Sequence, residues 1–410
     1  ESFQSVPEVV AYMAEKGVAA TEMTFTAQAR AAAAAGDPLK ALSYAREAAR
    51  KFGEGKKDSQ PKLRTYTPSL IAFCARRDLA GMWEVSEEVM SQDMHFSEAE
   101  HAYLLEACTH GRCAESSLKT LRRLEDELPA LSEFSLRLVR DMFALLGQEP
   151  PLAPPQGPAG WKLARGEVDE KGLCQACGEK LRVVDLEAEH FETFAEGISQ
   201  LAFEREAGRM KSEGDSHFGR FQKWLKKRGP FDIIVDGANV GMYGQARASP
   251  PQINPLQLSQ VIGELGRVYP KKKVLVILHN RRVNQLRNDR AGARVLDSIL
   301  QQCSLYATPT GSNDDWYWLY ASVAAGPWGK LVSNDEMRDH IFQLLAPKYF
   351  HKWKSRHQVK FEFWDNVLTL SPPPPFSECI QQSHRGHWHL PSSEGKEWLC
   401  IEPCQEGHAD

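Results

Sequence analysis

The stretch FDIIVDGANVG, from Phe231 to Gly241, constrains the fold of this chain more than any other part of it. Its first residues, Phe231–Val235, form an apolar and β-branched run of the kind that makes a buried strand. The run ends abruptly at Asp236, after which small residues allow the backbone to turn tightly. Ligands of open α/β sheets bind outside the carboxyl ends of the strands. Asp236 is therefore expected at a functional edge of a sheet.

Two more acidic groups follow strand-like runs downstream. The run SLYATPTG leads to Asp314 and Asp315. The run KLVSNDE leads to Asp335, with Asp339 one turn further on. Carboxylates gathered at one edge repel one another unless cations neutralise them, and an all-oxygen ligand set is the one that Mg²⁺ and Mn²⁺ prefer. We therefore predict a divalent-metal site, although a helix N-cap is the alternative for any single strand-end aspartate.

Strand-like runs alternate with helical periodicity through residues 187–369, which predicts a doubly wound parallel sheet. The expected strands are Phe231–Asp236, Lys273–Asn280, Ser304–Ala307, Leu331–Ser333 and Lys360–Trp364. The proline run Ser371–Pro375 is expected to close this region. The aromatic residues of Trp316–Gly329 lie at helical spacing, so they either pack in the core or stack on nucleotides.

Residues 1–147 show apolar positions at three- and four-residue spacing and almost no strand pattern, which predicts helices. Aligning Ala72 with Ala107 superposes two segments about 35 residues apart, the length of a helical-hairpin repeat. Phe25–Gly36 fits the first helix of an earlier unit, and the polar insertion Lys51–Pro61 lengthens the next spacing. Three or four units can be traced, with Arg77 where a glycine is usual. A plain helical scaffold is the alternative.

Gln148–Gly160 is rich in proline and glycine and lacks apolar periodicity, so it is expected to be a linker. Beyond it, Cys174 and Cys177 form a CxxC knuckle, which is half of a zinc site. The segment His384–Cys404 offers histidines and cysteines that would complete a Cys₃His set. The residues alone leave open which of them bind: His387 or His389, and Cys400 or Cys404. A redox pair is the other interpretation of an isolated CxxC.

The composition limits which compartment and which binding partners are consistent with this chain. The nine cysteines are scattered, which argues against a disulfide framework and favours a reducing compartment. The formal net charge of −4 excludes a uniformly basic surface. The basic residues gather instead in clusters that we expect to flank the acidic strand ends: Lys223–Arg228, Lys271–Lys273, Arg281–Arg294 and Lys348–Lys360. No stretch approaches the length of a membrane span. Because the chain begins at Glu1 and not at Met, we expect that a targeting segment has been removed.

The acidic strand ends resemble those of a known family. The motifs DGANVG, SNDDWYW and SNDEMRDH, in this order, are similar to the metallonuclease (NYN, PIN-like) domain of protein-only RNase P. The helical repeats resemble a pentatricopeptide array, in which stacked helix pairs read single-stranded RNA. The whole chain resembles the catalytic subunit of the animal mitochondrial branch of the family. DGAN alone would indicate only the broader NYN class.

The resemblance implies a mixed α and α/β architecture. A pentatricopeptide-repeat α-helical solenoid that binds RNA would span residues 1–147, followed by the linker at 148–160. A small split zinc-binding β domain would comprise residues 161–186 and 370–410. A PIN-like/NYN α/β metallonuclease domain with a parallel sheet would occupy residues 187–369. In the family, the zinc site joins segments on either side of the nuclease domain, which implies one structural Zn²⁺ bound by Cys174, Cys177, His389 and Cys400.

The acidic cluster indicates hydrolysis of an RNA phosphodiester with two divalent ions, Mg²⁺ or Mn²⁺. One ion would activate water, and the other would stabilise charge on the leaving 3′ oxygen. The expected catalytic residues and metal ligands are Asp236, Asp314, Asp315 and Asp335. Asn239 and Asp339 are expected to orient ligands or waters, with turn formation as the alternative role for Asn239.

The resemblance implies a narrower function. Family members remove the 5′ leader from precursor tRNA and leave a 5′ phosphate on the mature tRNA. The animal branch also implies a mitochondrial matrix location and two partners, a tRNA methyltransferase subunit and a short-chain dehydrogenase subunit. Two alternatives remain open: an NYN endoribonuclease that cuts another RNA, such as mRNA, and a non-catalytic RNA-binding scaffold. The intact acids argue against the scaffold, because a silent domain has no need for so much like charge.

Overall fold

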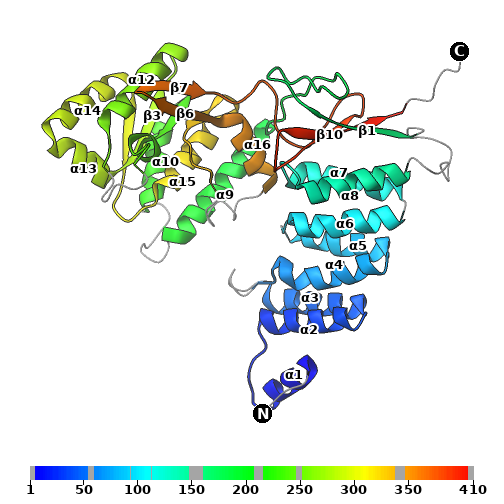
Figure 1. The fold of residues 1–410 in the computed structure, drawn as a ribbon. Helices are drawn as coiled ribbons and strands as arrows, with labels where there is room; N and C mark the ends of the chain where they lie inside the picture. The colour runs from blue at the N-terminus through cyan, green and yellow to red at the C-terminus, as the bar shows by residue number, and fades with distance from the viewer. Residues whose placement is uncertain are drawn as a thin grey trace, which may run out of the picture. The chain divides into compact units, whose positions relative to one another are not determined.

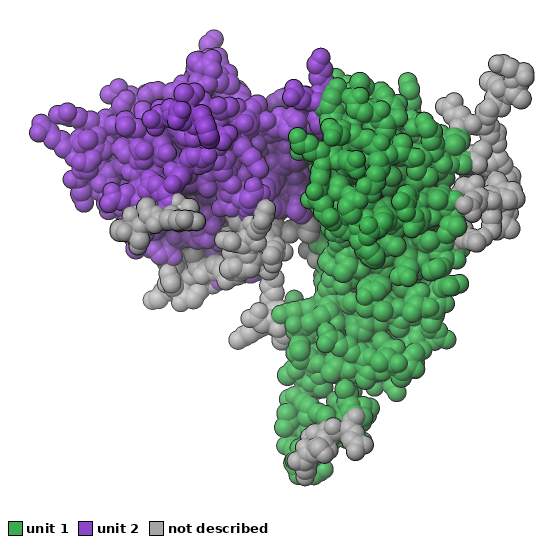
Figure 2. Space-filling view, viewed as in Figure 1, with its two compact units in different colours: residues 1–169, 173–181, 378–410 green, residues 170–172, 182–377 purple. Residues whose placement is uncertain are grey.

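The computed structural model describes residues 5–53, 60–92, 94–111, 113–146, 160–206, 216–245, 252–337 and 347–404. The chain forms two compact units (Figure 2): unit 1 comprises residues 1–169, 173–181 and 378–410, and unit 2 comprises residues 170–172 and 182–377. Residues 148–159 of the expected linker lie outside the described residues, and so does Asp339. Among the helices described, none combines the length and the apolar character needed to cross a membrane.

Unit 1 begins with helices that stack as successive hairpins (Figure 1). The first helices of two successive hairpins, α4 and α6, and the helix α8 that follows them begin at Leu63, Glu98 and Glu133, at the interval of about 35 residues expected from the sequence. The interval from α2 to α4 is longer, as the polar insertion predicts. The bounds are α1 (Val6–Glu15), α2 (Glu22–Ala34), α3 (Pro38–Phe52), α4 (Leu63–Ala75), α5 (Leu79–Ser91), α6 (Glu98–Gly111), α7 (Ala114–Glu127) and α8 (Glu133–Leu146).

Gly36 and Arg77 occupy the same place in two successive hairpins. Each is followed by an aspartate, Asp37 or Asp78, whose side chain caps the second helix of the hairpin. The φ angle is 77° at Gly36 and 57° at Arg77, so both adopt the left-handed conformation. That conformation costs a residue with a Cβ atom roughly 1–2 kcal/mol. The array thus keeps its turn geometry where the repeat has lost its glycine.

A four-stranded antiparallel sheet completes unit 1. Its order is β1-β10-β9-β8, so the first strand of the sheet pairs with the last. The bounds are β1 (Trp161–Glu167), β8 (Gln381–Gln382), β9 (Trp388–Pro391) and β10 (Glu397–Pro403). One hydrophobic core contains Leu136 and Phe143 of α8 together with Trp388, Leu390 and Ile401 of the sheet. The sheet therefore covers the end of the helical array, beside α7 and α8 (Figure 1).

Unit 2 contains a six-stranded sheet in the order β4-β3-β2-β5-β6-β7. The strands from β4 to β6 are parallel, and β7 returns antiparallel to β6. The bounds are β2 (Ile233–Asp236), β3 (Val274–His279), β4 (Ser304–Thr308), β5 (Lys330–Val332), β6 (Gln358–Trp364) and β7 (Val367–Ser371). The five expected strands are present, and β7 is an additional one. Because β7 reaches Ser371, the unit extends to Ser377, past the boundary expected at residue 369.

Helices cover both faces of this sheet, as a doubly wound fold requires (Figure 1). Ile234 and Leu331 pack on the face covered by α9 (Ala188–Glu206), α10 (His217–Arg228), α15 (Asp314–Ala324) and α16 (Pro347–His357). Ile233 and Val332 pack on the face covered by α12 (Pro255–Val268), α13 (Asn280–Asn288) and α14 (Arg290–Gln302). A short helix, α11 (Gly237–Gly241), follows β2, and the 3₁₀ helix η2 (Gly326–Trp328) follows α15. Trp316, Tyr317 and Trp318 are buried, so these aromatic residues belong to the core.

The basic clusters are not all at the acidic edge of the sheet, contrary to expectation. Lys271–Lys273 directly precedes β3, and Arg228 precedes β2, so both lie at the amino edge of the parallel strands. Helix α10 itself begins near the acidic edge, where His217 Nδ1 lies 3.4 Å from Ser312 Oγ. The expectation failed because distance along the sequence does not say which end of a strand a cluster adjoins.

Candidate catalytic and metal sites

Asp236 is the last residue of β2 and the N-cap of α11. One carboxylate oxygen, Oδ1, accepts a hydrogen bond from the Asn239 backbone N–H at 3.0 Å, and Oδ2 accepts one from Ser333 Oγ at 2.9 Å. The next residue must be glycine, because a Cβ atom at Gly237 would lie 2.8 Å from the Ile277 carbonyl oxygen of β3. The sheet register and this close approach together place the carboxylate at the edge of the sheet.

The environment of Asp236 disfavours its charged form. The side chain is only 4% exposed. Burial raises the pKa of Asp236 to about 7, with further contributions from the charges of Asp314 and Asp315, against the two hydrogen bonds that lower it. A buried carboxylate beside like charges is favourable only when a cation or a proton neutralises it. Such perturbed groups concentrate at functional sites.

The segment after β5 is held by side-chain hydrogen bonds to backbone. Ser333 Oγ, the donor to the carboxylate at the end of β2, accepts a hydrogen bond from the Asp335 N–H at 3.1 Å. The Asn334 side chain bonds both the N–H and the carbonyl of Phe361 on β6, at 3.0 and 2.6 Å. Gln358 Nε2 donates to the carbonyls of Ser333 and Asp335, at 2.8 and 2.9 Å. Asp335 is therefore fixed relative to β6.

Asn239 joins the segments that follow β2 and β5. Its backbone N–H donates to Asp236, and its side-chain Oδ1 accepts a hydrogen bond from the Asn334 N–H at 2.8 Å. It therefore connects the segments that carry Asp236 and Asp335, in addition to its place in the turn.

Asp314 and Asp315 are the first residues of α15, and Asn313 is its N-cap, accepting a hydrogen bond from the Asp315 N–H at 3.1 Å. Burial raises the pKa of Asp314, against its own backbone N–H and the charges of His279 and Arg282, which lower it. These two basic residues follow β3, at the end of the strand and in α13. The positive end of the α15 dipole also faces this pair of acids.

The expected acids thus gather at the carboxyl edge of the sheet. Asp236 interacts electrostatically with Asp314 and Asp315, and Ser333 connects it to Asp335. Within the described ranges, no three of these carboxylates offer oxygens within 4.8 Å of one another. Apart from the place of Ser333 inside the SNDE motif, nothing in the sequence pattern distinguishes Ser333 or Gln358, because their roles depend on hydrogen bonds across the sheet.

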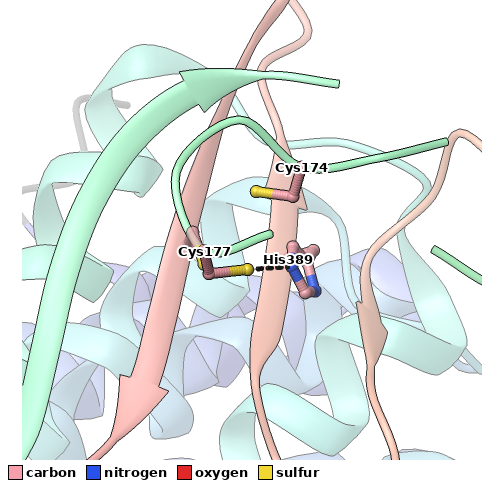
Figure 3. Close-up of side chains that lie close together, drawn as sticks. Cys174, Cys177 and His389 are labelled. Atoms are coloured by element: carbon pink, nitrogen blue, oxygen red, sulfur yellow. Dashed lines mark hydrogen bonds between the residues drawn. The ribbon is translucent and has the colours of Figure 1, made fainter. Parts of the chain in front are cut away.

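A second cluster lies in unit 1. Cys174, Cys177, His389 and Cys400 each offer one ligand atom, and these atoms all lie within 4.8 Å of one another. Figure 3 shows the Cys177 sulfur directed at the His389 ring, with Sγ 3.3 Å from Nε2. His389 of β9 and Cys400 of β10 are register partners, which brings them to one face of the sheet. Cys404 is exposed and lies outside the cluster.

The cluster favours the form of cysteine that binds metal. A hydrogen bond from Cys400 lowers the pKa of the Cys174 thiol to about 3, against burial, and His389 adds to the lowering. The same contact with Cys174, together with burial, raises the pKa of the Cys400 thiol. One thiolate is therefore stabilised among these residues, and the thiolate is the species that coordinates metal ions. The four side chains could hold a metal ion.

Comparisons with known proteins identify the family. A family model described as protein-only RNase P matches residues 168–402, which is more than half of the chain. The chain belongs to the protein-only RNase P family. A second model, the pentacotripeptide-repeat region of PRORP, matches residues 1–145. The expected family, its helical repeat region and its class of enzyme, a ribonuclease P, are thereby confirmed.

Relatives within the protein-only RNase P family come from plants and animals. Proteinaceous RNase P 3 of Arabidopsis thaliana is 36% identical over 95% of this chain and 72% of its own length. The mitochondrial ribonuclease P catalytic subunit of Rattus norvegicus is 24% identical over 59% of this chain and 42% of its own length. The crystal structure of nuclear proteinaceous RNase P 2 from A. thaliana matches with a TM-score of 0.67 at 33% identity, covering 97% of this chain and 86% of that chain. The overall fold expected from the sequence is confirmed.

Proposed function

We propose that this protein removes the 5′ leader of precursor tRNA by hydrolysis at the acidic edge of the unit 2 sheet, leaving a 5′ phosphate on the mature tRNA. The observation that carries the proposal is the buried Asp236, held by Ser333 and Asn239 and close enough to Asp314 and Asp315 for their charges to raise its pKa. Family membership supports RNase P substrates over other RNAs.

The donor set at this edge fits hard divalent ions. It consists of carboxylate oxygens. Burial raises the pKa of Asp236 and of Asp314, and a bound cation would favour their charged forms. We propose that Asp236, Asp314, Asp315 and Asp335 hold two Mg²⁺ or Mn²⁺ ions. Bound there, the ions would supply an activated water and stabilise negative charge at the leaving 3′ oxygen.

The other residues of the edge orient these acids. Ser333 fixes one oxygen of Asp236, and the Asn239 N–H fixes the other, so the carboxylate cannot rotate freely. Arg282 places positive charge beside Asp314, where a phosphodiester would bring further negative charge. The proposed orienting role of Asp339 stays a prediction, because that residue lies outside the described ranges.

We further propose that the helical array binds the folded tRNA. A groove of about 690 Å³ runs along the first helices of successive hairpins, α2, α4 and α6. Its lining includes Arg30 and Arg64, with Thr67 and Glu100 as polar groups. Basic and hydrogen-bonding side chains on one face of stacked helices suit recognition of RNA backbone and bases.

For the cysteine–histidine cluster we propose one structural Zn²⁺. Three cysteines and one histidine are a common tetrahedral ligand set for structural zinc. The ligands come from two segments about 210 residues apart, the CxxC turn and the β9–β10 pair. The ion would hold these segments together.

A cleavage assay with Asp314→Asn tests the nuclease proposal. The purified chain is incubated with a 5′-extended precursor tRNA and Mg²⁺, and the products are mapped at the mature 5′ end. Loss of one metal-binding carboxylate should lower the cleavage rate by on the order of 1000-fold while RNA binding stays within about twofold. Asp297→Asn, which removes an exposed acid of α14, is the matched control and should cleave like the unmodified chain.

Each alternative predicts a different result in this assay. Cleavage of an unrelated mRNA with equal efficiency would favour a general NYN endoribonuclease. RNA binding without cleavage, in the unmodified chain and under every metal condition, would favour a scaffold. Cleavage by Asp314→Asn at the unmodified rate would overturn the proposed site.

The partners and the location are finer proposals. We propose that the methyltransferase and dehydrogenase subunits join this chain in the mitochondrial matrix, because the helical array is short and one relative is a mitochondrial catalytic subunit. A plant relative is described as nuclear, so the compartment needs its own test. Cleavage only when both subunits are added would support the partners, and co-fractionation of the native protein with mitochondria would support the location.

A further inference from the structure

Helix α10 of unit 2 presents an exposed face made of cations. Phe218 and Phe221 are buried in the core that covers the sheet. The opposite side of the helix exposes positively charged residues at spacings of three, six and seven, which place them on one face. They are Arg220, Lys223, Lys226 and Lys227, defined here as the α10 surface. The helix contains no aspartate or glutamate.

A plain solvated helix face does not explain this arrangement well. The helix dipole favours cations in the last turn, where Lys226 and Lys227 lie. Arg220 and Lys223 lie outside that turn, and like charges three or four residues apart destabilise a helix by a few tenths of a kcal/mol per pair. The chain as a whole carries a net charge of −4, so a cationic face is not a by-product of its composition. Within the part of the chain that the structure describes, Arg220, Lys226 and Lys227 form no ion pair with an acid. These three cations are exposed and accessible to a negatively charged partner.

The α10 surface begins next to the proposed catalytic edge. His217 Nδ1 lies 3.4 Å from Ser312 Oγ, and Tyr317 Oη donates a hydrogen bond to the same oxygen at 3.1 Å. Ser312 precedes the metal-binding Asp314 by two positions. From there the twelve residues of α10 extend for about 18 Å to the amino edge of the sheet, where Gly229 follows. The cations of the α10 surface therefore lie along a line from the proposed site of cleavage to the opposite edge of the sheet.

A groove accompanies the helix. A cavity of about 360 Å³ is lined by Lys226, Gln222, Phe231 and Tyr320, among others. A second cavity, of about 730 Å³, shares Gln222 and Tyr320 with it. Its other wall, on α9, carries Glu192 and Glu196, which repel phosphate groups. Phosphates are therefore expected on the α10 side, with bases against the groove. Aromatic walls beside a cationic track are typical of single-strand binding.

We propose that the α10 surface binds the phosphate backbone of the single-stranded 5′ leader of precursor tRNA. This inference rests on the proposed function. The leader is joined to the bond that is cut, so it starts at the acidic edge, as the α10 surface does. The tRNA body is a folded, double-helical object, whereas an unpaired leader can follow a helix and turn its bases into the groove. The leader is therefore the part of the substrate that matches this surface.

The test compares two precursors of the same tRNA, one with a leader of a single nucleotide and one with a leader of about ten nucleotides. The full chain and the Lys226→Gln/Lys227→Gln variant are assayed for kcat/KM on both. The unmodified chain should favour the long leader by about 10-fold, and the variant should bring this ratio close to one. Removing two phosphate contacts should also lower the salt slope of long-leader binding by about 1.4.

Arg290→Gln/Arg294→Gln is the matched control, since it removes two exposed cations from α14 on the other face of the sheet. It should leave the leader ratio unchanged. An equal loss for both precursors in the lysine variant would show a contact with the tRNA body and overturn the proposal. The proposal would also be overturned if the unmodified chain cleaved both precursors with the same kcat/KM. The α10 surface would then bind another partner, such as an acidic protein. Absence of cleavage of either precursor would instead contradict the proposed function itself.

Discussion

Asp236 bears on the two interpretations of a strand-end aspartate, helix N-cap and metal ligand. It is a helix N-cap, through the hydrogen bond from the Asn239 N–H, and it is also the most buried of the clustered acids. At the start of α15 the N-cap is Asn313, so neither Asp314 nor Asp315 caps that helix. The N-cap interpretation and the metal-ligand interpretation therefore do not exclude each other at a strand end.

Ser333→Ala should weaken metal-dependent cleavage without unfolding the protein. The hydroxyl donates to Asp236 and accepts from the Asp335 N–H, so its loss releases two of the proposed ligands at once. We expect the Mg²⁺ concentration for half-maximal cleavage to rise by about 10- to 100-fold, the usual effect of removing a group that orients metal ligands. A Mg²⁺ titration of the initial rate measures this.

Ser322→Ala provides the control for that experiment. Ser322 is as fully buried as Ser333, but its hydroxyl donates to the Leu319 carbonyl within α15. A purely structural loss of one buried hydroxyl should affect both variants alike. If Ser322→Ala shifts the Mg²⁺ titration as far as Ser333→Ala does, Ser333 has no specific part in orienting the acids.

Between helices, Glu22 connects the first helices of two successive hairpins. This residue of α2 is 5% exposed, and its carboxylate accepts hydrogen bonds from Arg64 Nη2 and Thr65 Oγ1 of α4, each at 2.6 Å. Burial acts to raise its pKa, but these bonds and one from Thr26 outweigh it and lower the pKa to about 2. The contact therefore stabilises the stack of helices in its ionised form.

Glu22→Gln should destabilise the helical array in a pH-dependent way. Because the folded pKa lies below the ordinary value of 4.5, the stabilisation is present above about pH 5 and is lost as the pH falls towards 2. We expect the variant to lose roughly 2–3 kcal/mol at neutral pH and to approach the unmodified chain in acid. Thermal unfolding across this range measures the difference. Glu87→Gln, which removes an exposed partner of Lys119, should show no comparable trend.

The sequence predicted those secondary-structure elements whose burial requires a distinct pattern of apolar residues. Apolar, β-branched runs bounded by polar residues located the central strands β2 and β3, because burial on both faces demands such runs. The strand β7 was missed, since Val367–Ser371 alternates exposed and half-buried residues after a tight turn. Likewise, CxxC together with the histidines and cysteines of the last segment predicted a metal site, because these side chains complete a Cys₃His set. The roles of Ser333 and Gln358 could not be predicted from the sequence, because they depend on hydrogen-bond partners that only the folded sheet brings close.

For the molecule as a whole, the cysteine–histidine cluster joins parts of the chain far apart in sequence. Cys177→Ser should reduce the zinc content from about one ion per chain and lower the melting temperature of unit 1 by about 10 °C, because the metal-binding free energy contributes to folding. Elemental analysis and thermal unfolding measure the two effects. Cys404→Ser, which changes an exposed cysteine outside the cluster, should alter neither. Full zinc content in Cys177→Ser would contradict the proposed ligand set.

The sheet that covers α8 determines when, during synthesis, the core of the helical array can be completed. The core beneath α8 contains residues of β9 and β10, yet about 250 residues separate the end of α8 from β10 along the chain. At the usual speed of translation, roughly 10–50 s pass between the two. During that interval α8 packs on α6, but the part of the core around Leu136 and Phe143 lacks the residues that β9 and β10 contribute. The core of the helical array is therefore completed only after unit 2 has been made, and a chain that stops before β9 leaves that core incomplete.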